Sequence, residues 1–193
     1  MKNYISLLLC ILLINGCKQG IEPAGTQEIS EESIFNLTSD WRTEEGKTIR
    51  LSELKGKVLV VVMIYTSCKV ACPQLVADMK RIEQQVPEAY TGKIQYVLVS
   101  IDPDVDTPDK LKSFAITNDM DGEQWTFLQG DQNSVREFAN VLAVKYKEIA
   151  PMDFSHSNII SVFNPGGELV HQQEGLGVDN NETVNAVIET ASH

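Results

Sequence analysis

Residues 57–87 of the chain are KVLVVVMIYTSCKVACPQLVADMKRIEQQVP. The first nine, Lys57–Tyr65, form a continuous apolar and β-branched run, which is typical of a strand buried on both faces. After Cys68 and Cys72, apolar residues recur with helical spacing as far as Val86, where a proline ends the pattern. The stretch therefore predicts a buried strand followed by a helix, with the two cysteines at their junction.

Strand and helix patterns continue to alternate along the rest of the chain. Strands are predicted at Ile94–Ile101, Trp125–Leu128, Ser157–Phe163 and Glu168–Gln172, and helices at Pro108–Ile116, Asp131–Leu142 and Asn181–Ala191. Nearer the N-terminus, Phe35–Leu37 and Thr48–Leu51 flank a Glu45–Gly46 turn and predict a hairpin. This order predicts an α/β protein with a thioredoxin-like fold, in which helices flank a mixed central sheet and the N-terminal hairpin is an extension.

The first sixteen residues have the features of a bacterial secretion signal. A basic start precedes the apolar run Tyr4–Ile14, which is too short to span a bilayer. The run leads into the letters INGC, which resemble a lipobox whose cysteine, Cys17, becomes acylated; the alternative is an ordinary signal peptide with a chance cysteine. We therefore expect a lipoprotein signal peptide at 1–16, a flexible polar tether at 17–33 and one domain at 34–193.

These features predict a protein of the bacterial cell envelope, anchored to a membrane by its lipid, with the domain facing the periplasm or another extracytoplasmic side. Removal of residues 1–16 takes away one charged residue, Lys2, and so changes the formal charge from −11 to about −12. This negative charge argues against nucleic acid or an anionic membrane surface as a partner. We expect the domain to be a monomer.

Cys68 and Cys72 are the only thiols that would remain after cleavage and acylation, and they would lie where a dithiol can oxidise. On one helical turn, their Cβ atoms would be on the order of 5–6 Å apart. The N–H groups at the start of a helix would also favour the thiolate. Such a pair fits a metal clamp, a redox-active dithiol, a structural disulfide or two small core residues. The next buried strand leads to Asp102, and parallel strands would bring this carboxylate to the same edge of the sheet.

A metal site here would need a third ligand, and the sequence offers three histidines. His193 is the last residue, and His171 lies in a predicted hairpin strand, where we expect it to face solvent. His156 lies in the segment DFSHS, a predicted loop just before a buried strand, from which its ring could reach the cysteines. A simple hydrogen-bonding role for this loop histidine is the alternative.

From about Phe35 to the C-terminus, the chain resembles the Sco/SenC family of thioredoxin-fold copper proteins. Three segments carry the resemblance: GKTIRLSELKGKVLVVVMIYTSCKVACP (46–73) is similar to the family's strand-and-cysteine block, VSIDPDVDTPDKLKSF (99–114) to its Asp-Pro segment, and HSNIISVFNPGGELV (156–170) to its histidine segment. The chain departs from the family pattern at Lys69, where proline is common, and at Ser155, where aspartate often precedes the histidine.

The resemblance implies that Cys68 and Cys72 are thiolate ligands of a copper ion and that His156 is its imidazole ligand. Two thiolates suit Cu(I), and an added imidazole also permits Cu(II). Asp102 would contact these ligands without binding the ion itself, or it would act only as a turn residue. The implied function is copper delivery to the binuclear copper centre of cytochrome c oxidase. The apo copper-containing subunit of the oxidase would be the client, and a second partner would keep the thiols reduced.

A second hypothesis is an extracytoplasmic thiol–disulfide reductase that acts on the cysteines of a copper-protein partner. Cys68 would then be the attacking thiolate and Cys72 the resolving thiol. A peroxidase-like thiol enzyme is a third hypothesis, but it would need activating arginine and threonine residues, and only Thr66 lies close to the pair. Whether the protein is an enzyme therefore stays open: it would be one if it exchanges thiols and disulfides, but not if it only delivers metal.

Overall fold

The computed structural model describes residues 29–150 and 153–193, so the predicted signal peptide, Cys17 and most of the tether lie outside the described residues. The elements in chain order are η1 (Ile34–Asn36), β1 (Asp40–Thr43), β2 (Thr48–Arg50), η2 (Leu51–Leu54), β3 (Val58–Ile64), α1 (Ala71–Gln85), η3 (Glu88–Lys93), β4 (Ile94–Ser100), α2 (Pro108–Thr117), β5 (Trp125–Gln129), α3 (Gln132–Val141), β6 (Tyr146–Ala150), β7 (Asp153–His156), β8 (Ile159–Phe163), β9 (Leu169–Glu174) and α4 (Asn181–Ala191), where η marks a 3-10 helix. Within these two ranges, no helix has the length and apolar character needed to cross a membrane.

Seven strands form one mixed sheet in the order β2-β1-β5-β4-β3-β8-β9. Strands β3, β4 and β5 are parallel, and Ile64 at the end of β3 lies beside Ser100 at the end of β4. The outer strands β1, β2, β8 and β9 run antiparallel to their neighbours. The predicted α/β architecture, with a mixed central sheet flanked by helices, is confirmed.

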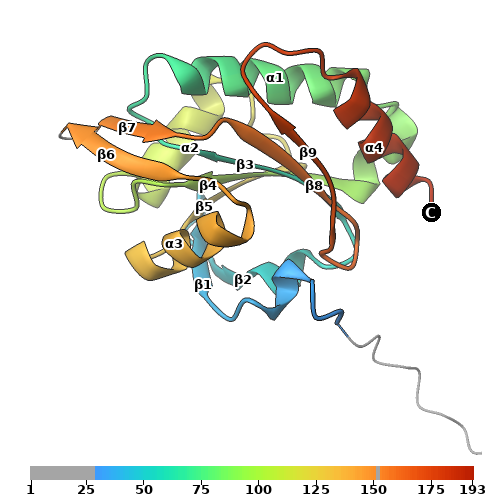
Figure 1. Ribbon diagram of the computed structural model, residues 1–193, viewed down its shortest axis with the longest axis horizontal. Helices are drawn as coiled ribbons and strands as arrows, with labels where there is room; N and C mark the ends of the chain where they lie inside the picture. Colours follow the sequence, from blue (N-terminus) through green and yellow to red (C-terminus); the bar gives the residue numbers. More distant parts are fainter. Residues whose placement is uncertain (1–28, 151–152) are drawn as a thin grey trace, which may run out of the picture.

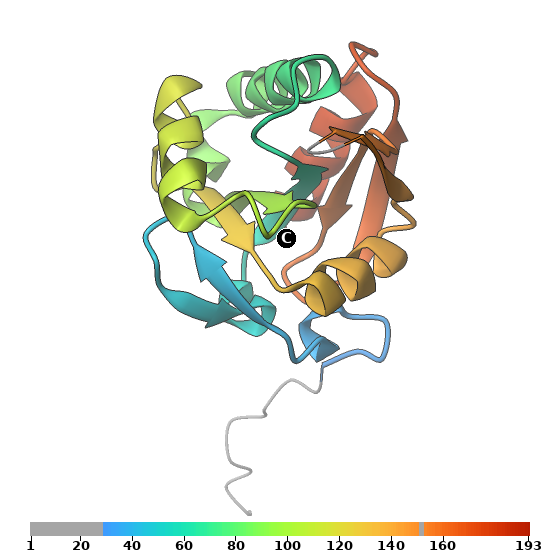
Figure 2. The same cartoon turned by 90° about the vertical axis from the view of Figure 1, so that its left-hand side faces the viewer.

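Strand β3 lies in the interior of the sheet, and all seven of its apolar residues are buried. Helix α1 buries the apolar face that the sequence predicts, including Leu75, Met79 and Ile82. It ends at Gln85 because Val86, which precedes a proline, takes an extended conformation. Helices α1 and α4 are in contact on one face of the sheet, and α3 lies on the opposite face (Figures 1 and 2).

The predicted N-terminal hairpin has the correct turn and second strand, but its first strand is wrong. Phe35 lies in η1 because the Ser33 side chain caps this short helix and accepts a hydrogen bond from the Phe35 N–H (3.1 Å). The Ser33 hydroxyl also donates to the Gly166 carbonyl (2.6 Å), and the Ile34 N–H donates to the Gly167 carbonyl (2.9 Å). Ser33 therefore belongs to the folded domain and not to the tether, and η1 is fixed beside the turn between β8 and β9.

Strands β6 and β7 form a separate two-stranded sheet that the sequence patterns do not predict. They pair antiparallel, with Tyr146 opposite His156. Most side chains of β6 are exposed, so the strand lacks the alternation of buried apolar and exposed polar residues that identifies a half-buried strand. The pair projects to the left in Figure 1, next to the loop that follows β3.

Candidate metal centre

The two cysteines lie between the end of β3 and the start of α1. Cys72 is the second residue of the helix and is fully buried, whereas Cys68 lies in the preceding turn and is partly exposed. Helix α1 therefore begins only just before Cys72, as Pro73 in its first turn allows, and the two cysteines do not share one helical turn. The turn is closed by a hydrogen bond from the Cys68 N–H to the Tyr65 carbonyl (3.2 Å).

The Cys68 sulfur binds the free N-terminus of α1. Val70, at the N-cap position, makes no side-chain cap, and the Cys72 N–H donates to Cys68 Sγ (3.2 Å). Pro73 occupies the next helical position and has no N–H to satisfy. The sulfur thus replaces the usual N-cap oxygen, and the helix N-terminus favours its negative charge.

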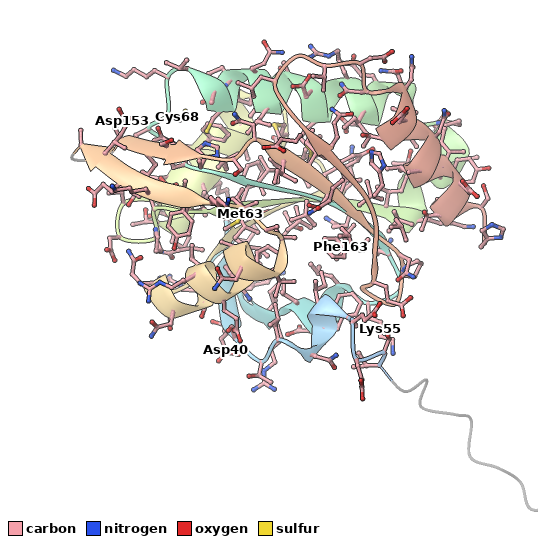
Figure 3. The ribbon with its side chains drawn as sticks, in the orientation of Figure 1. Asp40, Lys55, Met63, Cys68, Asp153 and Phe163 are labelled. Carbon is pink, nitrogen blue, oxygen red and sulfur yellow. The ribbon has the colours of Figure 1, made fainter. Side chains whose placement is uncertain are left out.

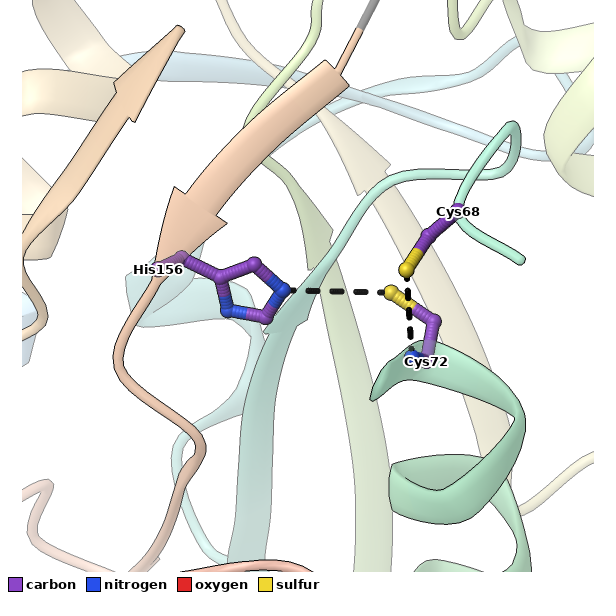
Figure 4. Close-up of side chains that lie close together, drawn as sticks. All are labelled: Cys68, Cys72 and His156. Carbon is purple, nitrogen blue, oxygen red and sulfur yellow. Dashed lines mark hydrogen bonds between the residues drawn. The ribbon is translucent and has the colours of Figure 1, made fainter. Parts of the chain in front are cut away.

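His156 reaches the cysteines from the far side of a shallow cleft (Figure 4). It is the last residue of β7, and not a loop residue as the sequence predicts. Its Nε2 lies 4.0 Å from Cys72 Sγ, and its Nδ1 lies 3.0 Å from the Ser157 carbonyl oxygen. Because a carbonyl oxygen only accepts, Nδ1 carries the ring proton in the neutral form, and Nε2 presents its lone pair to the sulfurs.

The three side chains meet the distance requirements of a metal centre. Cys68 Sγ, Cys72 Sγ and a ring nitrogen of His156 all lie within 4.8 Å of one another. A metal ion about 2.3 Å from sulfur and about 2.0–2.1 Å from nitrogen would hold such atoms about 3.8–4.0 Å apart in a trigonal arrangement. Shifts of about 1 Å or less therefore suffice to close the three donors on one ion.

The environment makes the two thiols unequal. Burial raises the pKa of Cys68, but hydrogen bonds from the Cys72 and Val70 N–H groups and the Cys72 thiol, with the Tyr65 hydroxyl nearby, outweigh it, so this pKa lies below its ordinary value. Burial also raises the pKa of Cys72, and the negative charges of Cys68 and Asp106 add to this increase. Burial lowers the pKa of His156 and favours its neutral, ligand form. The environment of the apo site therefore favours the thiolate at Cys68, the thiol at Cys72 and the neutral imidazole at His156.

Asp102 does not contact the three candidate ligands. It is 6% exposed and lines a separate pocket of about 660 Å³, together with Lys145, Glu148 and Phe154. Its Oδ2 has no hydrogen-bond partner among the described residues, and burial, followed by the charge of Asp106, raises its pKa. Asp102 was expected to lie near the cysteines, but it makes no direct contact with them in the described residues.

Asp106 is the carboxylate that supports the cysteine loop, and the sequence patterns do not single it out. It is fully buried and accepts hydrogen bonds from the Thr66 N–H (3.0 Å), the Thr66 hydroxyl and the Ser100 hydroxyl (2.7 Å). Asp102, Asp104 and Asp106 alternate in the same short segment, and nothing in that spacing identifies the one that accepts hydrogen bonds from Thr66 and Ser100.

Replacement of Asp106 with alanine should lower the free energy of unfolding by about 2–4 kcal/mol, because one buried and two partly buried donors lose their acceptor. Denaturant titration of the reduced variant measures this change. Asp104 is the matched control: it is exposed, and its recorded side-chain partner is Gln132, so Asp104→Ala should change the stability by about 0.5 kcal/mol or less. An Asp106 variant as stable as the control would contradict this role.

His171, which lies in the seven-stranded sheet, does not face solvent as expected. The His171 ring is partly buried, with Nε2 2.9 Å from the Thr183 hydroxyl on α4. Because that hydroxyl donates to Gln173 Oε1 (2.7 Å), it accepts the hydrogen bond from the His171 ring. His171 thus joins β9 to α4 and is not part of the candidate metal centre.

Comparison with known proteins gives consistent matches. The model of the SCO1/SenC family matches residues 25–192. The chain is 26% identical over 156 residues to the SCO1 protein homolog of Bacillus subtilis (strain 168), a match that covers 79% of this chain and 80% of that protein. The structure of Arabidopsis thaliana ScoI with copper bound superposes with a TM-score of 0.70 at 18% identity, covering 80% of this chain and 96% of that one.

A further similar structure is that of BsSco, a member of the Sco family of cytochrome c oxidase assembly proteins in which a disulfide switch was identified. It has a TM-score of 0.69 at 24% identity and covers 79% of this chain and 91% of that one. These structural likenesses show that the predicted thioredoxin-like fold is correct.

Proposed function

The chain belongs to the SCO1/SenC family, and on this basis we propose that it is a copper chaperone that delivers copper to the binuclear copper centre of cytochrome c oxidase. The observation that carries the proposal is the approach of two sulfurs and one imidazole nitrogen to within 4.8 Å of one another. A relative with copper bound and a relative from a family of cytochrome c oxidase assembly proteins have the same fold. Copper is the cargo in this proposal, and the apo copper-containing subunit of the oxidase is the client.

The donor set fits copper better than other common metals. Thiolates are soft ligands that select Cu(I), and imidazole also suits Cu(II). A structural zinc site would normally contain four protein ligands, and among the described residues the cluster consists of Cys68, Cys72 and His156. Three ligands leave one side of the ion open, and an incoming ligand from the client can bind there before the chaperone ligands leave.

The proposed location rests on the sequence. A signal peptide at 1–16 that resembles a lipoprotein leader, with acylation at Cys17, would hold the domain at the outer side of a bacterial membrane. The same location explains the need for a thiol-reducing partner, because both cysteines must be reduced to bind copper and this compartment favours disulfides.

Replacement of His156 with alanine tests the metal centre. We expect the affinity for Cu(II) to fall by about 100-fold, because the imidazole is the ligand that suits this ion. The affinity for Cu(I) should fall less, since both sulfurs remain. Titration of the reduced protein with each ion, followed by the visible absorption and EPR spectra of the Cu(II) form, measures both changes.

His171→Ala is the matched control, because this ring lies on β9 and contacts α4. It should bind both ions like the unmodified protein. If His156→Ala leaves the affinities and the Cu(II) spectra unchanged, His156 is not a ligand, and the proposal of a three-ligand copper site is wrong.

The unequal thiols favour a second candidate function, thiol–disulfide exchange. The Cys68 thiolate would attack a disulfide of the partner and form a mixed disulfide, releasing one partner thiol. Cys72 would then lose its proton and attack Cys68 Sγ, which releases the second partner thiol and leaves the Cys68–Cys72 disulfide. Two electrons from the thiol-reducing partner would restore the dithiol. This activity would survive His156→Ala, whereas the Cu(II) site would not.

A further inference from the structure

Tyr65 connects the two halves of the candidate metal centre. It directly follows β3, lies three residues before Cys68, and is 3% exposed. Its hydroxyl donates a hydrogen bond to Asp153 Oδ1 (2.9 Å) and accepts one from the Phe154 N–H (3.3 Å). The side chain of Tyr65, just after the strand that leads to the cysteines, thus holds the first two residues of β7, the strand that carries His156.

The ring of Tyr65 extends this contact along β7. It packs edge-on against Phe154, with ring centroids 5.2 Å apart, and against His156, with centroids 5.9 Å apart. Figure 3 shows Asp153 on β7 close to Cys68, and Tyr65 lines the same cleft as these two residues. The contacts therefore fix both the position of β7 and the side of the His156 ring that faces the sulfurs.

Strand β7 depends on such an external contact. It pairs only with β6 among the described residues, and this two-stranded sheet is separate from the seven-stranded one. An isolated two-stranded hairpin is marginally stable in water, and the side chains of β6 are mostly exposed. The hairpin therefore needs an attachment to the main domain to hold His156 at a defined distance from the cysteines.

We propose that Tyr65 is a positioning residue whose hydroxyl clamps β7 to the end of β3 and so holds His156 Nε2 within reach of the two sulfurs. This proposal rests on the proposed metal-binding function. In it, Tyr65 contributes no ligand atom to the ion: it acts through the histidine. Its main effect is on the imidazole side of the site, although its hydroxyl also favours the Cys68 thiolate.

Tyr65→Phe tests the clamp, because this change removes only the hydroxyl and keeps the buried ring. In the apo protein, amide hydrogen exchange in β7, beginning with the Phe154 N–H, should become at least about tenfold faster. In the copper-loaded protein, the Cu(II) affinity should fall by about tenfold, since loss of a group that orients a metal-bound histidine typically costs about 10- to 100-fold. The Cu(II) EPR spectrum should shift toward that of His156→Ala, and the Cu(I) affinity should fall by less than the Cu(II) affinity, because both sulfurs remain.

Tyr146→Phe is the matched control. Tyr146 lies on β6 directly opposite His156, and its hydroxyl makes no hydrogen bond to the residues that the structure describes. This variant should show unchanged exchange rates and unchanged copper spectra. Asp153→Ala removes the exposed acceptor of the clamp and provides a second test if Tyr65→Phe does not fold; it should change the exchange rates and the Cu(II) spectrum in the same direction.

The outcomes separate the clamp from the proposed function. If the unmodified protein shows a thiolate–imidazole copper site and neither variant alters it or the exchange of β7, the clamp is refuted and the copper site stands. If the unmodified protein binds no copper but Tyr65→Phe accelerates exchange in β7, the proposed function fails, while the attachment of the hairpin by Tyr65 is supported.

Discussion

Replacing Cys72 with serine is expected to weaken Cu(I) binding by roughly 10²- to 10³-fold. A structural zinc ion contributes about 10–16 kcal/mol through four ligands, so one ligand accounts for about 3–4 kcal/mol, which corresponds to this change in affinity. A serine hydroxyl does not replace the lost sulfur, because it is a harder donor and keeps its proton near neutral pH. Since Cys72 is fully buried, another side chain cannot easily take its place.

A competition titration against a Cu(I) chelator of known affinity measures this loss. Ala71→Ser is the matched control: it introduces the same hydroxyl one residue earlier in the first turn of α1, at a partly buried position. The control should compete as well as the unmodified protein, and both variants should unfold at similar denaturant concentrations. A Cys72→Ser protein with undiminished affinity would exclude this sulfur from the copper site.

The two cysteines of the reduced apo protein should differ in alkylation rate by about 100-fold or more, with Cys68 the faster. The thiolate is the reactive form, and its fraction at neutral pH falls about tenfold for each unit by which the pKa rises. Hydrogen bonds place the pKa of Cys68 below the ordinary value despite partial burial, whereas burial raises that of Cys72. The full burial of Cys72 slows its reaction further.

Brief exposure to iodoacetamide, followed by mass spectrometry of the two cysteine-containing peptides, gives both rates. The rate at Cys68 should rise with pH and reach half of its maximum below about pH 8.5, the midpoint of an unperturbed cysteine. In guanidinium chloride the two cysteines should react at similar rates, because the fold no longer distinguishes them. Equal rates in the native protein would contradict the roles of attacking and resolving thiol.

The central part of the fold could be predicted because its elements are defined by local patterns. The apolar run of β3 and the helical spacing of α1 both reflect burial, and both are observed. The hairpin β6–β7 could not be predicted in this way, since its strands are held by backbone pairing and leave most side chains of β6 exposed. The inward turn of Asp106 likewise depends on donors in two other segments, at Thr66 and Ser100.

The candidate site shows the same division. The position of His156 before a buried strand, together with the family resemblance, was enough to select it as a possible ligand, but its distance from the cysteines depends on the topology of the sheet. The antiparallel pairing of β8 with β3, with Val62 opposite Ile160, returns the chain to the cysteine loop after 84 residues. The role of Tyr65 was hidden because, at the end of an apolar run, its hydroxyl has no partner that is close in the sequence.

The attachment of η1 sets where the chain enters the domain relative to the thiols. Ser33 and Ile34 are hydrogen-bonded to the turn between β8 and β9, near the start of β3, whereas the cysteines follow the end of this strand. Seven strand residues separate these two poles by about 23 Å, and Figure 3 shows Lys55 and Cys68 at opposite ends of the molecule. A chain held at its N-terminus, as proposed, therefore enters the domain at the pole opposite its thiols, so that a partner can approach them without steric interference from the entering polypeptide.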